Sequence, residues 1–395
     1  MTDLELQEES KQISKEFNKL KRSMKDRMDE EDKDLLKRAF SLAKDAHAEV
    51  RRRSGEPYIL HPLAVAHIVA AEIGLGPASV ASALIHDVVE DSDYQLEDIE
   101  RLFGEEIAQI IDGLTKISGV FDQNISMQAE NFRKMLLTIS DDIRVILIKL
   151  ADRLHNMRTM ESMPQPKQLK IASETLYLYA PLAHRIGLYN LKTEMEDLGL
   201  KYTEPDLYRD IVLKLKNSRA GELRYLKRFT QHLKKILNQE GLEFTIKERT
   251  KSIYSIRKKM LKQGLSFEEI YDKFAIRVII DTPPEREKSD CWRVYSLVTD
   301  HYRPNTERLR DWISAPKANG YESLHTTVMG PEGYWVEVQI RSRRMDEVAE
   351  RGYAAHWKYK EDASGQSKLD RWINQIREVL ENNEGNAVDF VDEFK

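Results

Sequence analysis

Two histidines and two aspartates in the first half of the chain are the residues best suited to bind a metal ion: His61, His86, Asp87 and Asp152. A lone His-Asp pair is a weak motif, but Asp152 lies in a strongly apolar stretch, where an aspartate needs a cation or a polar partner. Two imidazoles with two carboxylates form a mixed nitrogen and oxygen ligand set, which suits manganese, iron or zinc. Such an ion lowers the pKa of a bound water and supplies hydroxide at neutral pH. These residues predict a metal-dependent phosphohydrolase centre.

Two further carboxylates follow the His-Asp pair. The stretch around the pair has the character of one helix, on which Glu90 and Asp91 lie one turn beyond His86 and Asp87. They could orient the water or act as general acid and base. The alternative is a solvated helix end, and we favour the functional interpretation for Glu90.

Groups that could hold a substrate flank the proposed ligands. Arg52 and Arg53 stand just before the first ligand helix, a position suited to gripping a phosphate or a base. Asn156 lies one turn past the second aspartate and faces the same way. We interpret the neighbouring His155 as a satisfied core histidine.

A basic stretch in the second half points to phosphates. Lys251, Ser255 and Lys259 are spaced four apart and would share one helix face, with Arg249 just upstream. A solvated basic helix is the usual explanation of such a pattern, but the acidic residues that follow favour a phosphate site.

Those acidic residues belong to two expected strands. Asp272 stands at the entrance of the first, residues 274–280, and Glu337 lies in the second, residues 334–340. In the second strand valine and isoleucine alternate with polar residues, so the apolar set would face the core and Glu337 the polar side. The two carboxylates could then hold a Mg ion that bridges nucleotide phosphates.

Between the two strands lies a short segment that resembles a nucleotide pocket. It contains Lys317, Asn319, Tyr321 and His325 within nine residues. The tyrosine can stack on a base, while the lysine and the histidine can reach phosphates. From spacing alone the second half is predicted to transfer nucleotide phosphates.

The elements that position these groups change character along the chain. Helical periodicity runs to about residue 239, and strand-like patterns begin after Gly241, which implies separate helical and mixed domains. We also expect a loop at 118–126, a buried helix at 141–157, a helix or strand at 292–299 and an amphipathic helix at 369–380.

Composition narrows the class of protein. The 395 residues are 41% hydrophobic and 33% charged, which describes a globular protein of two or three domains. The formal net charge of -5 argues against wholesale coating of nucleic acid or acidic membrane. One cysteine excludes an intrachain disulfide, and the acidic N-terminus is unlike a secretory signal. We therefore expect a cytoplasmic protein without membrane partners.

Taken together, the motifs resemble the RelA/SpoT family, the long bifunctional synthetase/hydrolases of the alarmones ppGpp and pppGpp that serve the stringent response. The resemblance covers nearly the whole chain in collinear order. The matching stretches are SGEPYILHP (54–62), HDVVED (86–91), QAENFRKM (128–135), KLADRLHNMRT (149–159), IYSI (253–256), NGYESLHTT (319–327) and EVQIR (337–341).

The resemblance implies two opposed activities. The first half would be an HD-type hydrolase that removes the 3′ pyrophosphate of (p)ppGpp, with Mn held by His61, His86, Asp87 and Asp152. The second would transfer pyrophosphate from ATP to the 3′ hydroxyl of GDP or GTP, with Mg. In the hydrolase half it further implies that Glu90 and Asp91 activate water, and that Arg52, Arg53 and Asn156 bind the substrate.

In the synthetase half the resemblance implies that Asp272 and Glu337 are the acidic catalytic and metal-binding positions. The ATP contacts would be Arg249, Lys251, Ser255 and Lys259. The residues on the side of the acceptor nucleotide would be Arg308, Arg310, Lys317, Asn319, Tyr321, His325 and Gln339.

The implied fold is multidomain, α and α+β: an all-helical HD-type domain, a helical connector and a nucleotidyltransferase-like mixed-sheet domain. We place the domains at 1–160, 161–205 and 206–365, with a C-terminal helix and tail at 366–395. The basic segment Arg308-Leu309-Arg310-Asp311 and the complete hydrolase motif are typical of members with two working sites.

Other interpretations stay open. The second half could act only as a nucleotide sensor beside a working hydrolase, or its basic helix could bind RNA, although the net negative charge and the lack of an aromatic platform argue against RNA. Long relatives continue into a C-terminal regulatory region, to which the resemblance assigns ribosome binding. The chain ends near where that region should begin, so it is either a fragment or a short form.

Overall fold

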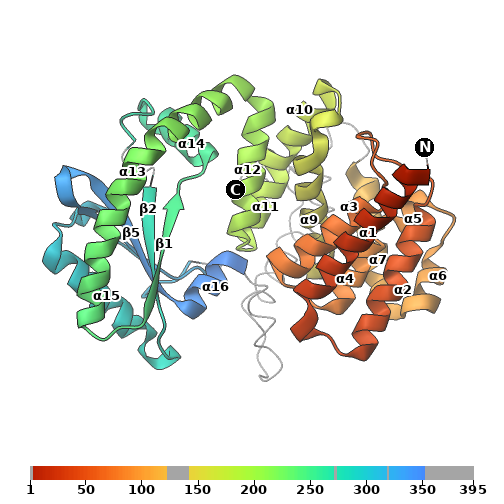
Figure 1. Cartoon of the computed structure of the whole chain (residues 1–395), viewed down its shortest axis with the longest axis horizontal. Helices are drawn as coiled ribbons and strands as arrows, with labels where there is room; N and C mark the ends of the chain where they lie inside the picture. The colour runs from red at the N-terminus through yellow and green to blue at the C-terminus, as the bar shows by residue number, and fades with distance from the viewer. Residues whose placement is uncertain (1–2, 122–141, 271–273, 318–319, 352–395) are drawn as a thin grey trace, which may run out of the picture. The chain divides into compact units, whose positions relative to one another are not determined.

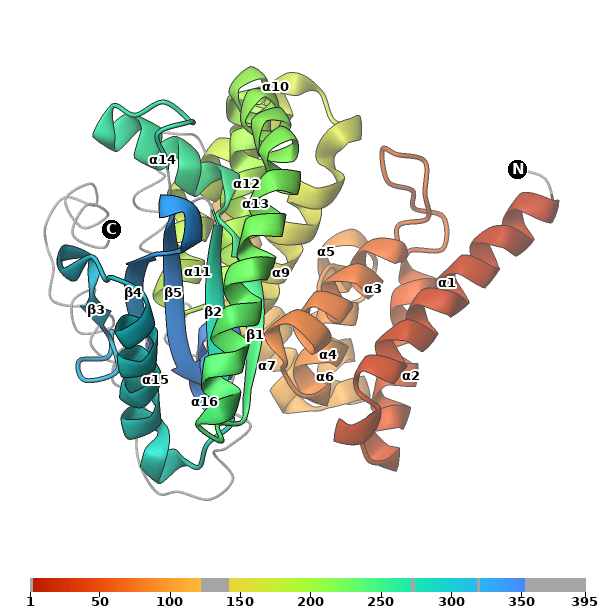
Figure 2. The ribbon, with the colours of Figure 1, turned by 60° about the vertical axis from the view of Figure 1, so that its left-hand side comes forward.

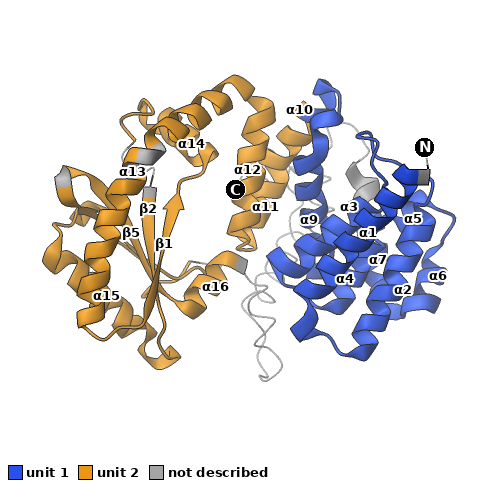
Figure 3. Cartoon of the chain, in the orientation of Figure 1, with its two compact units in different colours: residues 1–168, 357–395 blue, residues 169–356 orange. Residues whose placement is uncertain are grey.

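The computed structural model describes residues 3–121, 142–270, 274–317 and 320–351, and Figure 1 shows their elements in chain order. The described residues fold into two compact units, one ending at Gln168 and one beginning at Leu169 (Figure 3). No helix in these described ranges is long and apolar enough to cross a membrane. The finer boundaries at residues 160, 205 and 365 stay predictions.

The regular elements in the described part of the first unit are all helices. Its elements are α1 (Asp3–Ser23), η1 (Lys25–Arg27), α2 (Glu30–Ala46), α3 (Leu60–His67), η2 (Ile68–Ile73), α4 (Pro77–Leu84), α5 (Val88–Asp91), α6 (Leu96–Phe103), α7 (Glu105–Phe121), α9 (Ile143–Thr159), η4 (Met160–Ser162) and the start of α10 (Gln165–Glu174).

Local signals in the sequence set the ends of these helices. Asp29 accepts a hydrogen bond from the backbone of Asp32 and the Asp32 side chain accepts one in return, which forms a capping box at α2. Pro62 lies in the first turn of α3, as expected. Gly74 ends η2 at φ 95°, a left-handed conformation that glycine adopts at little cost.

The His86–Asp87 pair does not lie on a continuous helix, contrary to our expectation. α4 ends before the pair and α5 begins after it, with Ile85 at φ -113° and ψ 16°. Adjacent residues on one helix point in different directions, so the break is what allows both side chains to enter the same site. Glu90 and Asp91 consequently belong to the short α5.

One other expectation is corrected and one stays a prediction. Residues 118–121 of the predicted loop at 118–126 belong to α7, and its remaining residues lie outside the described ones. The expected helix at 369–380 also lies outside them.

The second unit combines helices with one sheet. Its helices are η5 (Thr175–Tyr179), α11 (Ala180–Arg185), α12 (Tyr189–Thr203), α13 (Pro205–Gln239), α14 (Ile253–Gln263), η6 (Pro284–Arg286), α15 (Glu287–His301), η7 (Thr306–Arg308), η8 (Pro331–Gly333) and α16 (Arg343–Arg351). Its strands are β1 (Phe244–Thr250), β2 (Phe274–Ile280), β3 (Arg310–Asp311), β4 (Leu324–Met329) and β5 (Trp335–Ser342).

The sheet is mixed, with strand order β1-β2-β5-β4-β3. β2 and β5 are parallel, and the other neighbouring pairs are antiparallel. Helices α13 and α15 cover its apolar face (Figure 2). Both expected strands are confirmed, and residues 292–299 are helical. The core on this face contains Phe229, Leu233, Ile276, Val278, Val294, Val298, Val336, Val338 and Ile340.

The opposite face of the sheet is polar, as the alternation in β5 predicted. Strand register aligns Lys247 with Arg277, Arg277 with Gln339, and Gln339 with His325. Four residues from four strands therefore form one row across the sheet, although the stretch of sequence from Lys247 to Gln339 that contains them is 93 residues long. The helical unit followed by this mixed-sheet unit confirms the predicted fold class.

Candidate active sites

The four proposed metal ligands of the first unit meet in its interior. His61 Nε2 lies 3.3 Å from Asp152 Oδ1 and 3.7 Å from Asp87 Oδ2, and His86 Nε2 lies 3.0 Å from Asp87 Oδ2. Ligand atoms of His61, His86 and Asp152 all lie within 4.8 Å of one another. α3, the turn after α4, and α9 each supply part of this cluster.

The cluster fits a divalent cation. The backbone carbonyl of Ala83 lies 2.9 Å from His86 Nδ1, so Nδ1 donates and Nε2 is left for the site. That Nε2 is buried, and the carboxylate oxygen Oδ2 of Asp87 lies 3.0 Å from it. A buried imidazole nitrogen directed at two carboxylates is the arrangement that a metal satisfies.

The electrostatics of the cluster agree with this. Burial lowers the pKa of His86, but the adjacent Asp87 outweighs it and raises that pKa to about 9. Burial likewise opposes ionisation of Asp152, yet Lys149 and His61 hold its pKa well below the usual range. Without a metal, positive side chains and a proton balance the two carboxylates. The same carboxylates would attract a cation.

Tyr58 orients one of the carboxylates. Its hydroxyl donates to Asp87 Oδ2 at 2.7 Å, and its ring packs on the buried His47, with centroids 4.6 Å apart. Burial, followed by the charge of Asp87, raises the Tyr58 pKa, so the phenol stays protonated and can only donate to the carboxylate. The sequence analysis did not single out Tyr58.

His155 is part of this site, and interpreting it as an ordinary core histidine was too narrow. Its Nδ1 lies 2.7 Å from His61 Nδ1 and 3.3 Å from Arg52 Nη1. Burial, reinforced by the neighbouring His61 and Arg52, lowers its pKa to about 3, so the ring is neutral and can accept hydrogen bonds. It therefore links the ligand His61 to the proposed substrate arginine.

Some of the proposed substrate and proton-transfer residues are hydrogen-bonded to the metal cluster, and others are exposed beside it. Arg52 Nη2 donates to Asn156 Oδ1 at 3.0 Å, and Asn156 Nδ2 donates to the metal-side carboxylate of Asp152 at 2.6 Å. Arg53 is exposed. Glu90 and Asp91 are also exposed, on α5 immediately after the ligand turn. Asn156 thus contacts the proposed ligand Asp152 directly, and Arg52 reaches it through Asn156.

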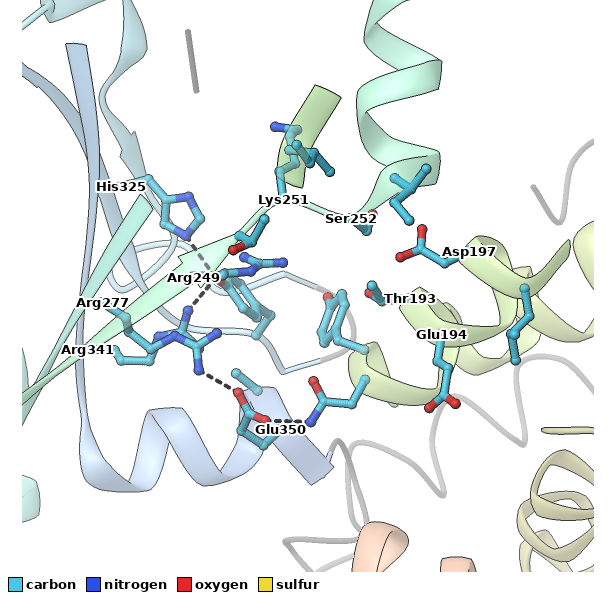
Figure 4. Close-up of a pocket in the computed structure, with 18 of the residues that line it drawn as sticks. Thr193, Glu194, Asp197, Arg249, Lys251, Ser252, Arg277, His325, Arg341 and Glu350 are labelled. Carbon is cyan, nitrogen blue, oxygen red and sulfur yellow. Dashed lines mark hydrogen bonds and ion pairs between the residues drawn. The ribbon is translucent and has the colours of Figure 1, made fainter. Parts of the chain in front are cut away.

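The second unit contains a cavity of about 750 Å³ on the polar face of the sheet. Figure 4 shows His325, Arg341 and Arg277 on the sheet side, with Lys251 and Ser252 near the start of α14. Helix α12 forms the opposite wall. The proposed site residues that line this cavity are Arg249, Lys251, Lys317, Tyr321 and His325.

A closed ring of hydrogen bonds fixes the side chains beside this cavity. Glu337 Oε1 lies 3.2 Å from His325 Nδ1, and His325 Nε2 lies 2.8 Å from the Tyr321 hydroxyl. Arg341 Nη2 donates to that hydroxyl at 3.0 Å and to Gln339 Oε1 at 2.9 Å. Gln339 Nε2 closes the ring by donating to Glu337 Oε1 at 3.0 Å. Residues from the loop before β4, from β4 and from β5 are thereby locked together.

Glu337 is held as a carboxylate by this ring. Burial alone would raise its pKa, but the hydrogen bond and charge of His325 lower the pKa to about 2. Its Oε1 is used by the ring, and its other oxygen makes no hydrogen bond to a described residue. An ionised oxygen beside a phosphate-sized cavity suits a Mg ion. Asp272, its proposed partner, lies outside the described residues.

The proposed phosphate contacts are placed differently from our expectation. Lys251 precedes α14, whose cap is Ser252, so it does not share a helix face with Ser255 and Lys259. Arg249 is the second-to-last residue of β1 and is exposed. The helix starts late because the Ser252 hydroxyl accepts a hydrogen bond from the Ser255 amide, which makes residue 252 an N-cap.

The proposed acceptor-side residues fall into two groups. Lys317 Nζ lies 4.3 Å from the centre of the Trp312 ring and 5.3 Å from that of Tyr321. Arg308 belongs to η7, and Arg310 is exposed in β3 and donates to the carbonyl oxygens of residues 307 and 309. Neither arginine lines the cavity. Asn319 lies outside the described residues.

Sequence reasoning missed Arg277, which lies on β2 and lines the cavity. Its Nη1 donates to Asp346 at 2.9 Å and to Glu350 at 2.5 Å, both on α16. A signal was available, because Arg277 is a single charged residue in an otherwise apolar strand, where a charge requires partners.

The comparisons with known proteins identify the family of each half of the chain. An HD domain family model matches residues 39–189, and the region found in RelA / SpoT proteins matches residues 248–364. The bifunctional (p)ppGpp synthase/hydrolase SpoT of Escherichia coli is 42% identical over 365 residues. A GTP pyrophosphokinase of Myxococcus xanthus is 42% identical over 355 residues. The chain belongs to the RelA/SpoT family.

Coverage differs between the chain and its relatives. The alignments take in 91% of this chain and 51% of the E. coli protein, and 89% of this chain and 46% of the M. xanthus protein. This RelA/SpoT chain thus spans about half the length of these relatives. Among solved structures, a metazoan ortholog of SpoT is 31% identical and aligns with 32% of this chain and 70% of its own, with a TM-score of 0.28.

Proposed function

We propose that the chain catalyses both alarmone reactions. In one, water cleaves ppGpp or pppGpp to GDP or GTP and pyrophosphate. In the other, pyrophosphate passes from ATP to the 3′ hydroxyl of GDP or GTP, leaving AMP. The observation that carries the proposal is that each unit has its own set of buried, ionised groups, one suited to a metal and water and one to nucleotide phosphates.

For the hydrolase, His61, His86, Asp87 and Asp152 would hold a divalent cation, which we expect to be manganese. Bound there, the ion supplies a water of lowered pKa. The residues of the chain perform the remaining tasks. We assign the proton transfers to Glu90 and Asp91, which follow the ligand turn and are open to solvent.

The hydrolase substrate would be held from the side of α9. Arg52 presents a guanidinium already ordered by Asn156 and His155, so less conformational entropy is lost when it binds a phosphate or the base. Arg53 is exposed and would add positive charge at the entrance.

For the synthetase, the cavity on the polar face would bind both nucleotides. Arg249, Lys251, Ser255 and Lys259 supply positive charge and a hydroxyl for the ATP phosphates. Arg277 adds a second guanidinium on the cavity wall. On the acceptor side we assign Arg308, Arg310, Lys317, Asn319, Tyr321, His325 and Gln339.

The acidic residues of the synthetase would act on the acceptor hydroxyl. Glu337, with a pKa of about 2, is a carboxylate at neutral pH and could hold magnesium together with Asp272. Because His325 and Gln339 fix Glu337 Oε1, the carboxylate is positioned before substrate arrives.

A paired assay tests the proposal. One sample of the purified chain receives ATP, GDP and Mg²⁺, and the other receives ppGpp and Mn²⁺; both are analysed by nucleotide chromatography. We expect ppGpp and AMP in the first and GDP with pyrophosphate in the second. Turnover of ppGpp alone would favour the alternative in which the second unit is only a nucleotide sensor, and turnover in neither would refute the proposal.

A further inference from the structure

Helix α12 forms one wall of the cavity, although it lies almost entirely outside the two regions matched by family models, which end at residue 189 and resume at 248. Asn190, Thr193, Glu194 and Asp197 all line the cavity, and their spacing of three and four residues places them on one face of the helix. Figure 4 shows Thr193, Glu194 and Asp197 on this wall.

Asp197 makes a hydrogen bond to the first turn of α14, the helix that carries the proposed ATP contacts Ser255 and Lys259. Its Oδ1 accepts a hydrogen bond from the Tyr254 amide at 2.8 Å. This amide belongs to the first turn of α14, where a helix leaves its N–H groups without intrahelical partners. Asp197 therefore caps α14 from a different helix.

The cap is completed by Ser252. Its hydroxyl accepts from the Ser255 amide at 3.2 Å and donates to the Ser255 hydroxyl at 2.7 Å. The amides of residues 254 and 255 are thus bound by side chains of the protein. Two first-turn amides of α14 are therefore already occupied, so we expect α14 to contact phosphate mainly through its side chains.

The same wall also supports the arginine on β2. Asn190 Nδ2 donates to Glu350 Oε2 at 2.5 Å, while Glu350 Oε1 accepts from Arg277 Nη1 at 2.5 Å. One face of α12 therefore restrains two cationic parts of the cavity: the start of α14 through Asp197, and Arg277 through Glu350.

We propose that Asp197 is a positioning residue for the site that binds the nucleoside triphosphate. By capping α14 it fixes the turn that carries Lys251, and it orients Ser255 and Lys259 on the helix. The inference rests on the proposed synthetase function. Asp197 is assigned no contact with a reacting atom; it acts through the backbone amide of Tyr254 in the first turn of α14. Its charge also complements the positive end of the helix.

Replacing Asp197 by an uncharged hydrogen-bond acceptor distinguishes its role as a helix cap from a purely electrostatic role of its negative charge. Asn is as good a helix cap as Asp, so Asp197→Asn keeps an oxygen for the Tyr254 amide while removing a negative charge from the edge of a phosphate site. Asp197→Ala removes both. Positioning predicts a defect in the alanine variant that the asparagine variant restores.

The experiment measures synthesis kinetics and, independently, binding of α,β-methylene ATP by calorimetry. For Asp197→Ala we expect the KM for ATP and the Kd of the analogue to rise about tenfold, the size expected from loss of one helix cap. The KM for GDP and the kcat should change less than twofold, and Asp197→Asn should lie within threefold of the parent chain.

A control variant removes a local helix cap in the other unit. Asp29 caps α2, so Asp29→Ala also removes a carboxylate cap but should leave the analogue affinity unchanged. A merely structural role for Asp197 would lower the melting temperature or kcat without changing the Kd. Unchanged Kd in Asp197→Ala, or equal weakening in Asp197→Asn and Asp197→Ala, overturns the proposal.

Failure of the proposed function gives a different result. If the parent chain binds the analogue but makes no ppGpp, synthetase activity is refuted, while the analogue affinities of the two Asp197 variants still decide the positioning role. If the parent chain does not bind the analogue at all, Asp197 positions no triphosphate site and this inference is wrong.

Discussion

Removing one oxygen atom tests whether the first unit is built around a metal ion. Tyr58→Phe deletes the hydroxyl that donates to Asp87 Oδ2 at 2.7 Å. The phenyl ring can keep its packing against His47, 4.6 Å between centroids, and its edge contact with His61 at 5.6 Å. The substitution therefore changes the orientation of one proposed ligand while leaving all four proposed ligands in place.

The expected rise in the Kd for Mn²⁺ follows from the hydrogen bond that is lost. A hydrogen bond to a charged group contributes about 1.5–3 kcal/mol, and a partner behind a metal ligand is typically worth about 10- to 100-fold in affinity, or about 1.4–2.8 kcal/mol. Asp87 keeps its contact with His86 at 3.0 Å, which places the expected loss near the lower end. We expect the Kd for Mn²⁺ to rise about 10- to 30-fold.

Free Mn²⁺ can be measured by electron paramagnetic resonance during titration of the metal-free chain. Tyr94→Phe is the control, because Tyr94 lies in the same unit and its hydroxyl bonds to no described residue. Hydrolysis of ppGpp at saturating Mn²⁺ should recover most of the parent rate. A Kd for Tyr58→Phe within twofold of the parent value would refute the idea that Asp87 is a ligand oriented by this hydroxyl.

Four further results are expected. Glu337→Gln should reduce synthesis at least 100-fold and leave hydrolysis within twofold in the paired assay. The folded-state pKa of Glu337 is lowered to about 2, so its carboxylate stabilises the fold above about pH 4.5. That contribution to the free energy of unfolding is lost as the pH falls toward 2. Acid unfolding of Glu337→Gln should therefore depend less on pH than that of the parent chain. Arg52→Ala should raise the KM for ppGpp about tenfold with a smaller change in Mn²⁺ affinity, since Arg52 contacts His155 and Asn156 but no proposed ligand. Mn²⁺ at about 100 times its Kd should stabilise the first unit by about 2.7 kcal/mol in thermal unfolding, and EDTA should reverse this.

Sequence patterns predicted the elements whose periodicity is unambiguous. Alternation in β5 separated Val336 and Val338, which are buried in the core, from Glu337 on the polar face. The apolar run of β2 gave its bounds directly. Helix and strand were indistinguishable at residues 292–299, because α15 buries a face of mixed size and polarity such as Cys291 and Val294.

The candidate sites were predictable in their residue types and less so in their geometry. Spacing cannot reveal that the chain leaves the helix at Ile85, which is what brings His86 and Asp87 together. His155 was assigned to the core because its contacts with His61 and Arg52 join residues about 100 positions apart. No local pattern contains such a contact.

The two sites handle buried charge in different ways, and this difference decides what each can bind. In the first unit two carboxylates face the buried His86 Nε2 atom, which lies 3.0 Å from Asp87 Oδ2. A charge set of this kind is incomplete until a cation or a proton enters. In the second unit the ring from Glu337 through His325, Tyr321, Arg341 and Gln339 is closed by its own hydrogen bonds, while Arg341 Nε and Nη1 have no hydrogen-bond partner among the described residues. That ring needs no ligand to form, so its contribution is a rigid wall against which nucleotides can bind, and metal removal should affect the first site far more than the second.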